Sequence, residues 1–123
     1  MQNLKHKTMT YLVDILSKNE LKEKYRRLAF SYHPDKGGCT SIMQKINEEY
    51  SILQDGFNTK PNSLRELKIG HTIYVNNSEC VVTDVDRKLF KAKSLATKRE
   101  AYFDKSTGYG LFNFKIRANI YCN

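Results

Sequence analysis

The chain has 123 residues and a formal net charge of +8, with 21 Lys and Arg against 13 Asp and Glu. This length excludes a large α/β enzyme, a TIM barrel and a long repeat array, and it suits one ordinary domain or two small ones. Hydrophobic residues make up 40% and charged residues 28%, which is typical of a globular chain and not of a disordered one.

Three widely spaced cysteines, Cys39, Cys80 and Cys122, form no C-x-x-C pair. Their odd number and spacing argue against a disulfide scaffold or a zinc site, so we expect neither a metal nor a cofactor. The N-terminal residues lack the apolar run of a secretory signal, and no stretch reaches the roughly 18 apolar residues of a membrane span. We therefore expect a cytoplasmic protein with no membrane partner.

The composition changes near Asn58, where Gly56, Asn58, Pro61, Asn62 and Ser63 cluster. Residues 1–58 hold 9 basic and 7 acidic side chains, whereas residues 59–123 hold 12 and 6, so most of the surplus charge lies in the second half. The hydrophobic pattern also changes there, from helical spacing to strand-like alternation. We predict an α+β chain with a helical domain at 1–58, a linker at 59–66 and a small basic β-domain at 67–123.

The first half predicts three helices. A short one covers roughly residues 10–16. A second follows the capping-box pattern Ser17-x-x-Glu20 and runs to about Tyr32, where Pro34 ends it. Its apolar face is formed by Leu21, Tyr25, Leu28, Ala29 and Tyr32, and its opposite face carries Lys22, Lys24, Arg26 and Arg27.

A third helix is predicted to begin near Ser41, with a capping box to Gln44, and to end at Gly56 as a C-terminal cap. Its buried stripe consists of Ile42, Met43, Ile46, Tyr50 and Leu53. The two long helices should pack as an antiparallel hairpin because the connecting loop is short, with the first helix lying across them.

The loop between the long helices carries the most specific pattern in the chain. The segment Tyr25-Arg26-Arg27-Leu28-Ala29-Phe30-Ser31-Tyr32-His33-Pro34-Asp35-Lys36, followed by Ile46-Asn47-Glu48-Glu49-Tyr50-Ser51-Ile52-Leu53, resembles the J-domain of DnaJ-type co-chaperones. The resemblance covers about residues 8–57. The compact Lys36-Gly37-Gly38 loop resembles the J-domains of viral tumour antigens, and the chain has neither a Gly/Phe-rich region nor a Cys-rich zinc domain, as in class C proteins.

The resemblance implies a partner of the heat-shock protein 70 (DnaK) type, whose ATP hydrolysis the chain would stimulate without catalytic groups of its own. It implies that His33, Pro34 and Asp35 form the activating loop. Tyr25, Arg26 and Arg27, with Lys22 beside them, would form the docking face.

The residue chemistry agrees with these roles. Asp35 is an anionic acceptor suited to a partner arginine, and Pro34 fixes the backbone between two functional side chains. A basic helix face favours encounter with an acidic surface, and salt should weaken this attraction. The alternatives are that Pro34 only ends a helix and that the cations only form a solvated face.

The second half predicts short antiparallel strands, near residues 67–75, 80–85, 89–93, 101–103 and 109–116, with turns at 76–78, 86–88 and 105–108. Such strands in so short a segment predict a small antiparallel barrel or a curled sheet.

Aromatic and basic residues alternate in this half, a pattern found in small barrels that bind single-stranded nucleic acid. The candidate contacts are Lys91, Lys93, Arg99, Lys115 and Arg117. The alternative is that Phe90, Phe103, Phe112 and Phe114 form the core of the domain and the lysines keep its surface soluble. Two functions follow: a J-domain co-chaperone directed to a client or site by its β-domain, or a small nucleic-acid-binding protein whose J-like module is a scaffold.

Overall fold

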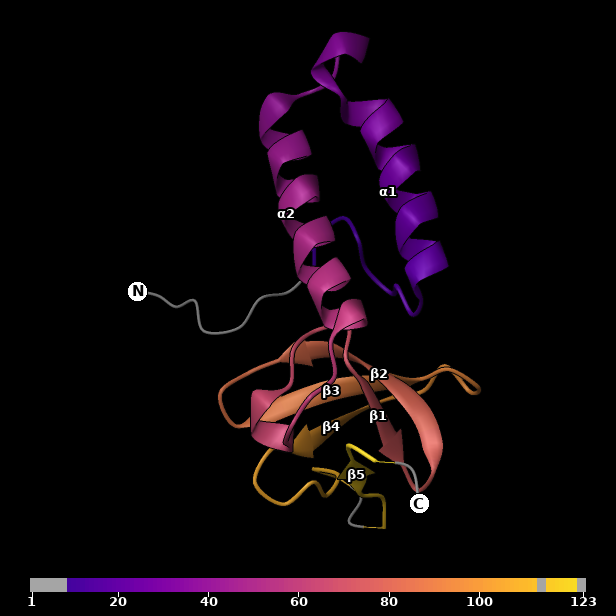
Figure 1. Cartoon of the computed structure of the whole chain (residues 1–123), viewed down its shortest axis with the longest axis vertical. Helices are drawn as coiled ribbons and strands as arrows, with labels where there is room; N and C mark the ends of the chain where they lie inside the picture. Colours follow the sequence, from indigo (N-terminus) through magenta and orange to yellow (C-terminus); the bar gives the residue numbers. More distant parts are fainter. Residues whose placement is uncertain (1–8, 113–114, 122–123) are drawn as a thin grey trace.

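The computed structural model describes residues 9–112 and 115–121. A hairpin of two helices stands on a curled antiparallel sheet of five strands (Figure 1). The helical elements are α1 (Lys18–Tyr32), the 3-10 turn η1 (Pro34–Lys36), α2 (Thr40–Asn58) and the 3-10 turn η2 (Leu64–Glu66). The strands are β1 (Thr72–Val75), β2 (Ser78–Val85), β3 (Leu89–Ser94), β4 (Glu100–Asp104) and β5 (Ala118–Asn119). Within the described residues, no helix is long and apolar enough to cross a membrane.

Helix α1 has the predicted bounds, because both of its ends are set by local sequence. The Ser17 Oγ accepts a hydrogen bond from the Glu20 N–H at 3.2 Å. The second half of the predicted capping box is wrong, since the Glu20 carboxylate accepts from the N–H of Leu16, at 2.9 Å, and not from that of Ser17. At the other end, the His33 N–H donates to the Ala29 carbonyl at 2.9 Å before Pro34 turns the chain.

Helix α2 follows the predicted apolar stripe but differs at both ends. Met43, Ile46 and Leu53 are buried. The predicted capping box at Ser41 is wrong, because the helix begins one residue earlier, after Cys39, without a side-chain cap. Gly56 is not a C-terminal cap either, since the helix continues to Asn58.

The prediction of a first helix at residues 10–16 is wrong: the chain has two α-helices in its described part, and this segment forms bends against α2. The buried carboxylate of Glu49, on α2, accepts hydrogen bonds from the N–H groups of Thr10, Tyr11 and Leu12 at 2.8, 2.9 and 2.9 Å. Asp14 then takes a positive φ of 57°, which interrupts any helical turn. A seven-residue segment gains too few helical hydrogen bonds to resist these constraints.

The sheet has the strand order β4-β3-β2-β1-β5, and every neighbouring pair is antiparallel. Asn76 and Asn77 connect β1 to β2 with φ angles of 52° and 70°, the left-handed geometry of a two-residue hairpin turn. The core of the sheet is built around Ile73, Val82, Phe90 and Phe103, as predicted for the two phenylalanines, whose rings stack at 5.4 Å. The same prediction is wrong for Phe112, which is 89% exposed. The sheet thus forms a curled half-barrel around one apolar core.

The described residues of the segment predicted as a strand at 109–116 pair only at single positions. Gly110 pairs with Phe103 of β4, and Tyr109 pairs with Arg117, just before β5. This segment therefore links the two outer strands of the sheet and covers part of the β4 edge. Residues 113–114, including Phe114, and residues 122–123, including Cys122, lie outside the described part of the chain.

The hairpin and the sheet share a second apolar core. Met9, Leu12, Leu53 and Ile69 pack together there, although Ile69 lies just before β1. Gly56 lets α2 approach this segment closely, because a Cβ at Gly56 would lie 1.8 Å from the carbonyl oxygen of Ile69. The proposed boundaries at 58 and 66 remain a prediction, but the two halves contact each other through this core.

Candidate functional site

The loop after α1 is a tight turn held by its own backbone. The carbonyl of His33 accepts hydrogen bonds from the N–H groups of Lys36 and Gly38, at 2.9 and 3.0 Å. Gly38 has to be glycine, because a Cβ there would lie 2.1 Å from the carbonyl oxygen of Tyr32. The loop is thus preformed at the tip of the hairpin, at the end of the molecule away from the sheet (Figure 1).

The side chains of this loop are turned toward solvent. The Nδ1 atom of His33 accepts a hydrogen bond from the Asp35 N–H at 3.2 Å, so the proton of the neutral ring lies on Nε2. The Asp35 carboxylate is 3.7 Å from the same nitrogen, and its side chain is 89% exposed. A free imidazole N–H and a free carboxylate are therefore offered side by side, on a backbone fixed by Pro34.

Phe30 and Lys36 extend this exposed tip. The Phe30 ring is 69% exposed, and the Lys36 ammonium lies 4.7 Å from its centre. Sequence periodicity did not single out Phe30, because its place on the open side of α1, between Ala29 and Ser31, carries no local signal. The tip thus combines one apolar ring with charges of both signs.

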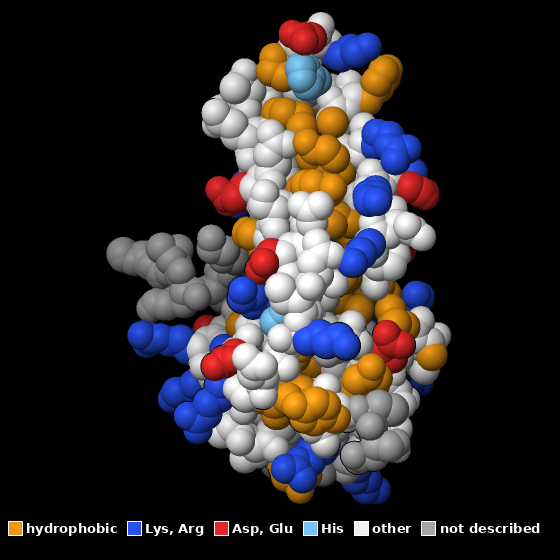
Figure 2. Space-filling view, in the orientation of Figure 1, with side chains coloured by type: hydrophobic (Ala, Val, Ile, Leu, Met, Phe, Trp, Pro, Cys, Tyr) orange, Lys and Arg blue, Asp and Glu red, His pale blue; other side chains and the backbone are white. Residues whose placement is uncertain are grey.

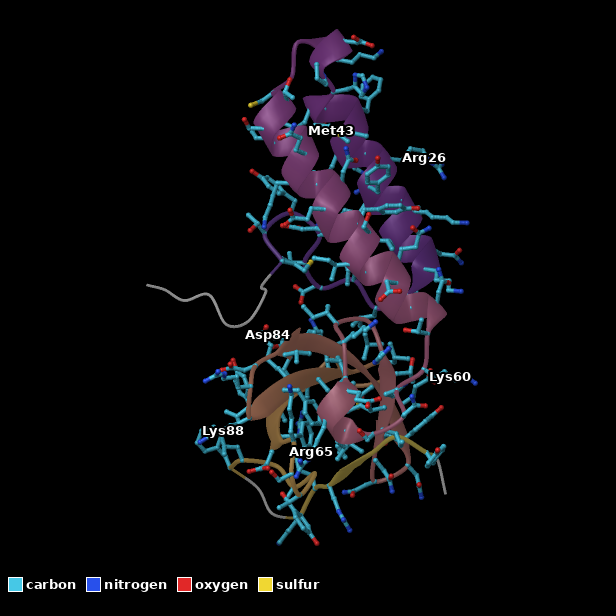
Figure 3. The ribbon with its side chains drawn as sticks, turned by 60° about the vertical axis from the view of Figure 1, so that its left-hand side comes forward. Arg26, Met43, Lys60, Arg65, Asp84 and Lys88 are labelled. Atoms are coloured by element: carbon cyan, nitrogen blue, oxygen red, sulfur yellow. The ribbon has the colours of Figure 1, made fainter. Side chains whose placement is uncertain are left out.

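The predicted basic face of α1 is exposed. Lys22, Arg26 and Arg27 form no ion pair with any other described residue, and Figure 3 shows Arg26 projecting away from α2. Lys and Arg side chains follow this helix in the space-filling view, with a histidine at the tip of the hairpin (Figure 2). This face and the loop are continuous along α1.

Tyr25 is placed differently from the cations. Its ring stacks on Tyr50 of α2 with the ring centres 4.2 Å apart, and its hydroxyl donates to Asn47 at 2.7 Å. Tyr25 therefore joins the two helices and is half-buried.

Cys39 lies at the other end of the loop, where it precedes the first turn of α2. Hydrogen bonds from the backbone N–H groups of Ile42 and Ser41 lower the pKa of its thiol. The thiol is free and exposed at the N-cap position of α2.

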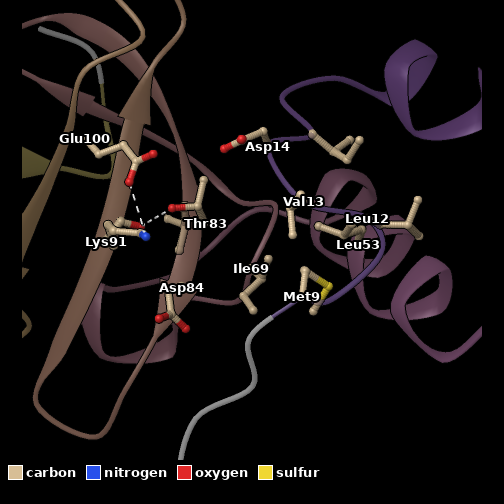
Figure 4. A pocket seen from close by; sticks show the side chains of 12 residues that line it. Met9, Leu12, Val13, Asp14, Leu53, Ile69, Thr83, Asp84, Lys91 and Glu100 are labelled. Carbon is tan, nitrogen blue, oxygen red and sulfur yellow. Dashed lines mark hydrogen bonds and ion pairs between the residues drawn. The ribbon is translucent and has the colours of Figure 1, made fainter. Parts of the chain in front are cut away.

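The second predicted set of cations does not form a free surface. Lys91 pairs with Glu100 at 3.2 Å, and Lys93 pairs with Asp14 at 3.0 Å and with Glu100 at 3.8 Å. Burial alone would lower the pKa of Lys91, but its hydrogen bond with Glu100 and the nearby negative charges raise it. Lys91 and Glu100 line the sheet side of a small cleft of about 90 Å³ between residues 9–15 and the sheet (Figure 4).

The remaining three cations of that set are dispersed. Arg99 is exposed in the turn before β4. Arg117 lies against the ring of Tyr109, 5.0 Å from its centre, and Lys115 is exposed two residues earlier. In the described part of the chain, no group of His, Cys, Asp or Glu is arranged to hold a metal ion.

Comparison with known proteins identifies the helical half. The DnaJ domain family matches residues 12–60. Over 46 residues the chain is 48% identical to the mitochondrial import inner membrane translocase subunit TIM14 of Candida albicans, an alignment that covers 37% of this chain and 29% of the relative. It is 44% identical over 39 residues to the chaperone protein dnaJ A6 of Oryza sativa, covering 32% of this chain and 9% of that protein.

A viral relative extends further along the chain. The small t antigen of budgerigar fledgling disease virus is 30% identical over 90 residues, which cover 68% of this chain and 60% of the antigen. The chain thus spans less than a third of the TIM14 relative and less than two thirds of the antigen. No solved structure matches the chain.

Proposed function

We propose, since residues 12–60 form a DnaJ domain, that this chain is a co-chaperone that docks on an ATP-loaded chaperone of the heat-shock protein 70 type. It would then stimulate ATP hydrolysis by that partner, and the sheet half would select the client or site. The observation that carries the proposal is the preformed loop, with the His33 ring and the Asp35 carboxylate turned to solvent at the end of an unpaired basic helix.

Each part of the site has a role in this proposal. The cations of α1 attract an acidic surface of the partner and orient the encounter. The Asp35 carboxylate then accepts from a partner arginine, while the His33 Nε2–H donates to a partner oxygen. Because the loop is held by its own backbone, little conformational entropy is lost when it binds.

The scaffold alternative, in which the J-like module has no partner, is supported less well. A module kept only as scaffold has no need for an exposed carboxylate and three unpaired cations on one helix. Lys91 and Lys93, on which the nucleic-acid alternative partly rests, are occupied by Glu100 and Asp14.

The proposal is tested by titrating the chain into a heat-shock protein 70 chaperone and measuring ATP hydrolysis. The double substitution Arg26→Ala/Arg27→Ala removes two docking cations, and we expect the concentration for half-maximal stimulation to rise about tenfold, with less loss at high salt. The control is Lys98→Ala/Arg99→Ala, which removes the same charge from a turn of the sheet. Equal effects of the two double variants would contradict docking through α1.

A further inference from the structure

Two neighbouring turns of the sheet bring three unpaired cations together. The β2–β3 turn carries Arg87 and Lys88, and the turn after β4 carries Lys105. The two turns are joined by a hydrogen bond from the Lys105 N–H to the Lys88 carbonyl at 2.9 Å. None of these three side chains forms an ion pair with another described residue.

The turn at residues 104–108 connects these cations to an aromatic surface. The Arg117 Nε donates to the carbonyl of Thr107 at 3.3 Å, and its guanidinium lies over the Tyr109 ring. The Tyr109 carbonyl in turn accepts from the Asp104 N–H at 3.0 Å. Arg117 and Tyr109 therefore flank the turn that carries Lys105.

Two large apolar side chains follow Tyr109 and Gly110 in the sequence. Leu111 is 38% exposed and Phe112 is 89% exposed, the most exposed large hydrophobic side chain among the described residues. Burying a phenylalanine ring is worth about 2–3 kcal/mol, so this exposed ring, three residues after Tyr109, is available for binding. We call the set formed by Arg87, Lys88, Lys105, Tyr109, Phe112 and Arg117 the turn surface.

The carboxylates next to the turn surface accept hydrogen bonds from backbone N–H groups of their own turns. Asp86 accepts from the N–H of Arg87 at 2.7 Å, and Asp104 accepts from the N–H of Ser106 at 2.7 Å. Burial lowers the pKa of the Lys105 ammonium and the nearby Asp86 carboxylate opposes this, but no ion pair joins these two side chains. Figure 2 shows Lys and Arg side chains gathered along one edge of the sheet half, and Figure 3 places Lys88 there, well below the helical hairpin.

We propose that the turn surface binds single-stranded nucleic acid. Its cations would contact phosphates, while the exposed Phe112 and the arginine-backed Tyr109 offer rings on which bases stack. An acidic peptide would use the cations but not two exposed rings, so nucleic acid accounts for more of the surface. The site is distinct from the cations first predicted from sequence, except for Arg117, and it leaves the loop of the helical hairpin free.

The test is fluorescence anisotropy of the full chain with a labelled 20-nucleotide single strand. The variant Arg87→Ala/Lys88→Ala should weaken binding about tenfold and reduce the slope of log affinity against log salt by about 1.4, the value for two lost phosphate contacts on a single strand. Phe112→Ala should weaken binding with an unchanged salt slope, because stacking releases no counterions. The matched control Lys98→Ala/Arg99→Ala removes two cations from another turn and should change the slope much less.

Three results would overturn the proposal: no binding at low salt, equal losses in the two double variants, or binding of a labelled polyglutamate as strong as that of the single strand. The last result would assign the surface to an acidic protein partner. Circular dichroism of each variant shows that the fold is intact, which is expected because Arg87, Lys88 and Phe112 are exposed.

Discussion

Glu49 decides the path of the chain before α1. Its carboxylate is fully buried, with 0% exposure, and its only partners among the described residues are three backbone N–H groups of the segment at 10–12. A buried charge is tolerated when it is this well satisfied by hydrogen bonds. Glu49 thus holds the N-terminal segment against the hairpin, where Leu12 fills the shared core.

Replacing Glu49 by Ala should therefore destabilise the chain by about 2–4 kcal/mol, because three partly buried donors lose their acceptor. Glu49→Gln keeps one carbonyl oxygen for Tyr11 and Leu12 but turns an amide toward Thr10, so about half of that loss is expected. Urea unfolding followed by circular dichroism measures both values. A Glu49→Ala variant as stable as the wild type would show that the carboxylate does not hold the segment.

His71 is the second buried polar side chain, and its hydrogen bonds hold the connection between α2 and β1. Its Nδ1 accepts from the Lys68 N–H at 3.0 Å, and its Nε2 lies 2.8 Å from the Thr59 hydroxyl. That hydroxyl donates to the Asp55 carbonyl, so it has to accept from a proton on Nε2. Only the neutral ring with its proton on Nε2 satisfies both contacts.

The stability of the chain should consequently depend on pH through His71. Burial and, next, the charge of Lys68 lower the pKa of the His71 ring below 6.5, while Asp55 opposes them. The unfolded chain then binds the proton more readily, so the stabilisation is complete above pH 6.5 and is lost as the pH falls below it. Urea unfolding from pH 8 to pH 5 should show a steeper decline for the wild type than for His71→Gln; parallel curves would exclude this role.

Helix α1 could be predicted at both ends because its signals are local: Ser17 as the cap, apolar residues at helical spacing, and Pro34 as the stop. The β1–β2 hairpin was likewise indicated by Asn76 and Asn77. The segment at 10–16 could not be predicted, because its path depends on Glu49, which is 37 to 39 residues away in sequence. No local sequence pattern predicts such a contact.

Gly56 shows the same limit for α2. A glycine near the end of an apolar helical pattern predicts a cap, but this one lies inside the helix, where the backbone at Ile69 crosses it. The reason for glycine is the close approach of a second element, which a one-dimensional pattern does not contain.

Gly56→Ala tests this contact between elements. An alanine normally stabilises a helix relative to glycine by about 0.5–1 kcal/mol. Here the new methyl group meets a backbone carbonyl, so we expect a net loss of about 1–3 kcal/mol in the free energy of unfolding. The control is Ser51→Ala, at an exposed position of the same helix, which should be neutral or slightly stabilising. A stabilised Gly56→Ala variant would contradict the close approach.

At the scale of the whole molecule, the loop of the hairpin and the turn surface of the sheet lie in different parts of the chain, joined by the core around Leu53 and Ile69. The position of the loop was predictable from His33-Pro34-Asp35 and the helices around it, but the exposed Phe30 ring beside it was not. The role of Lys93 was not, since its partner Asp14 is 79 residues away in sequence. Some cations of the sheet half are therefore paired at its junction with the helical half, and others are unpaired at its turns.

The central claim is that the preformed loop activates a partner and does not merely end a helix. The measurement is single-turnover ATP hydrolysis by a heat-shock protein 70 chaperone, with saturating amounts of the wild-type chain or of His33→Gln. The imidazole is 49% exposed, so the substitution should leave the helical circular dichroism unchanged. We predict that the wild type accelerates hydrolysis severalfold and that His33→Gln leaves the basal rate. Equal acceleration by both chains, or by neither, would contradict the claim.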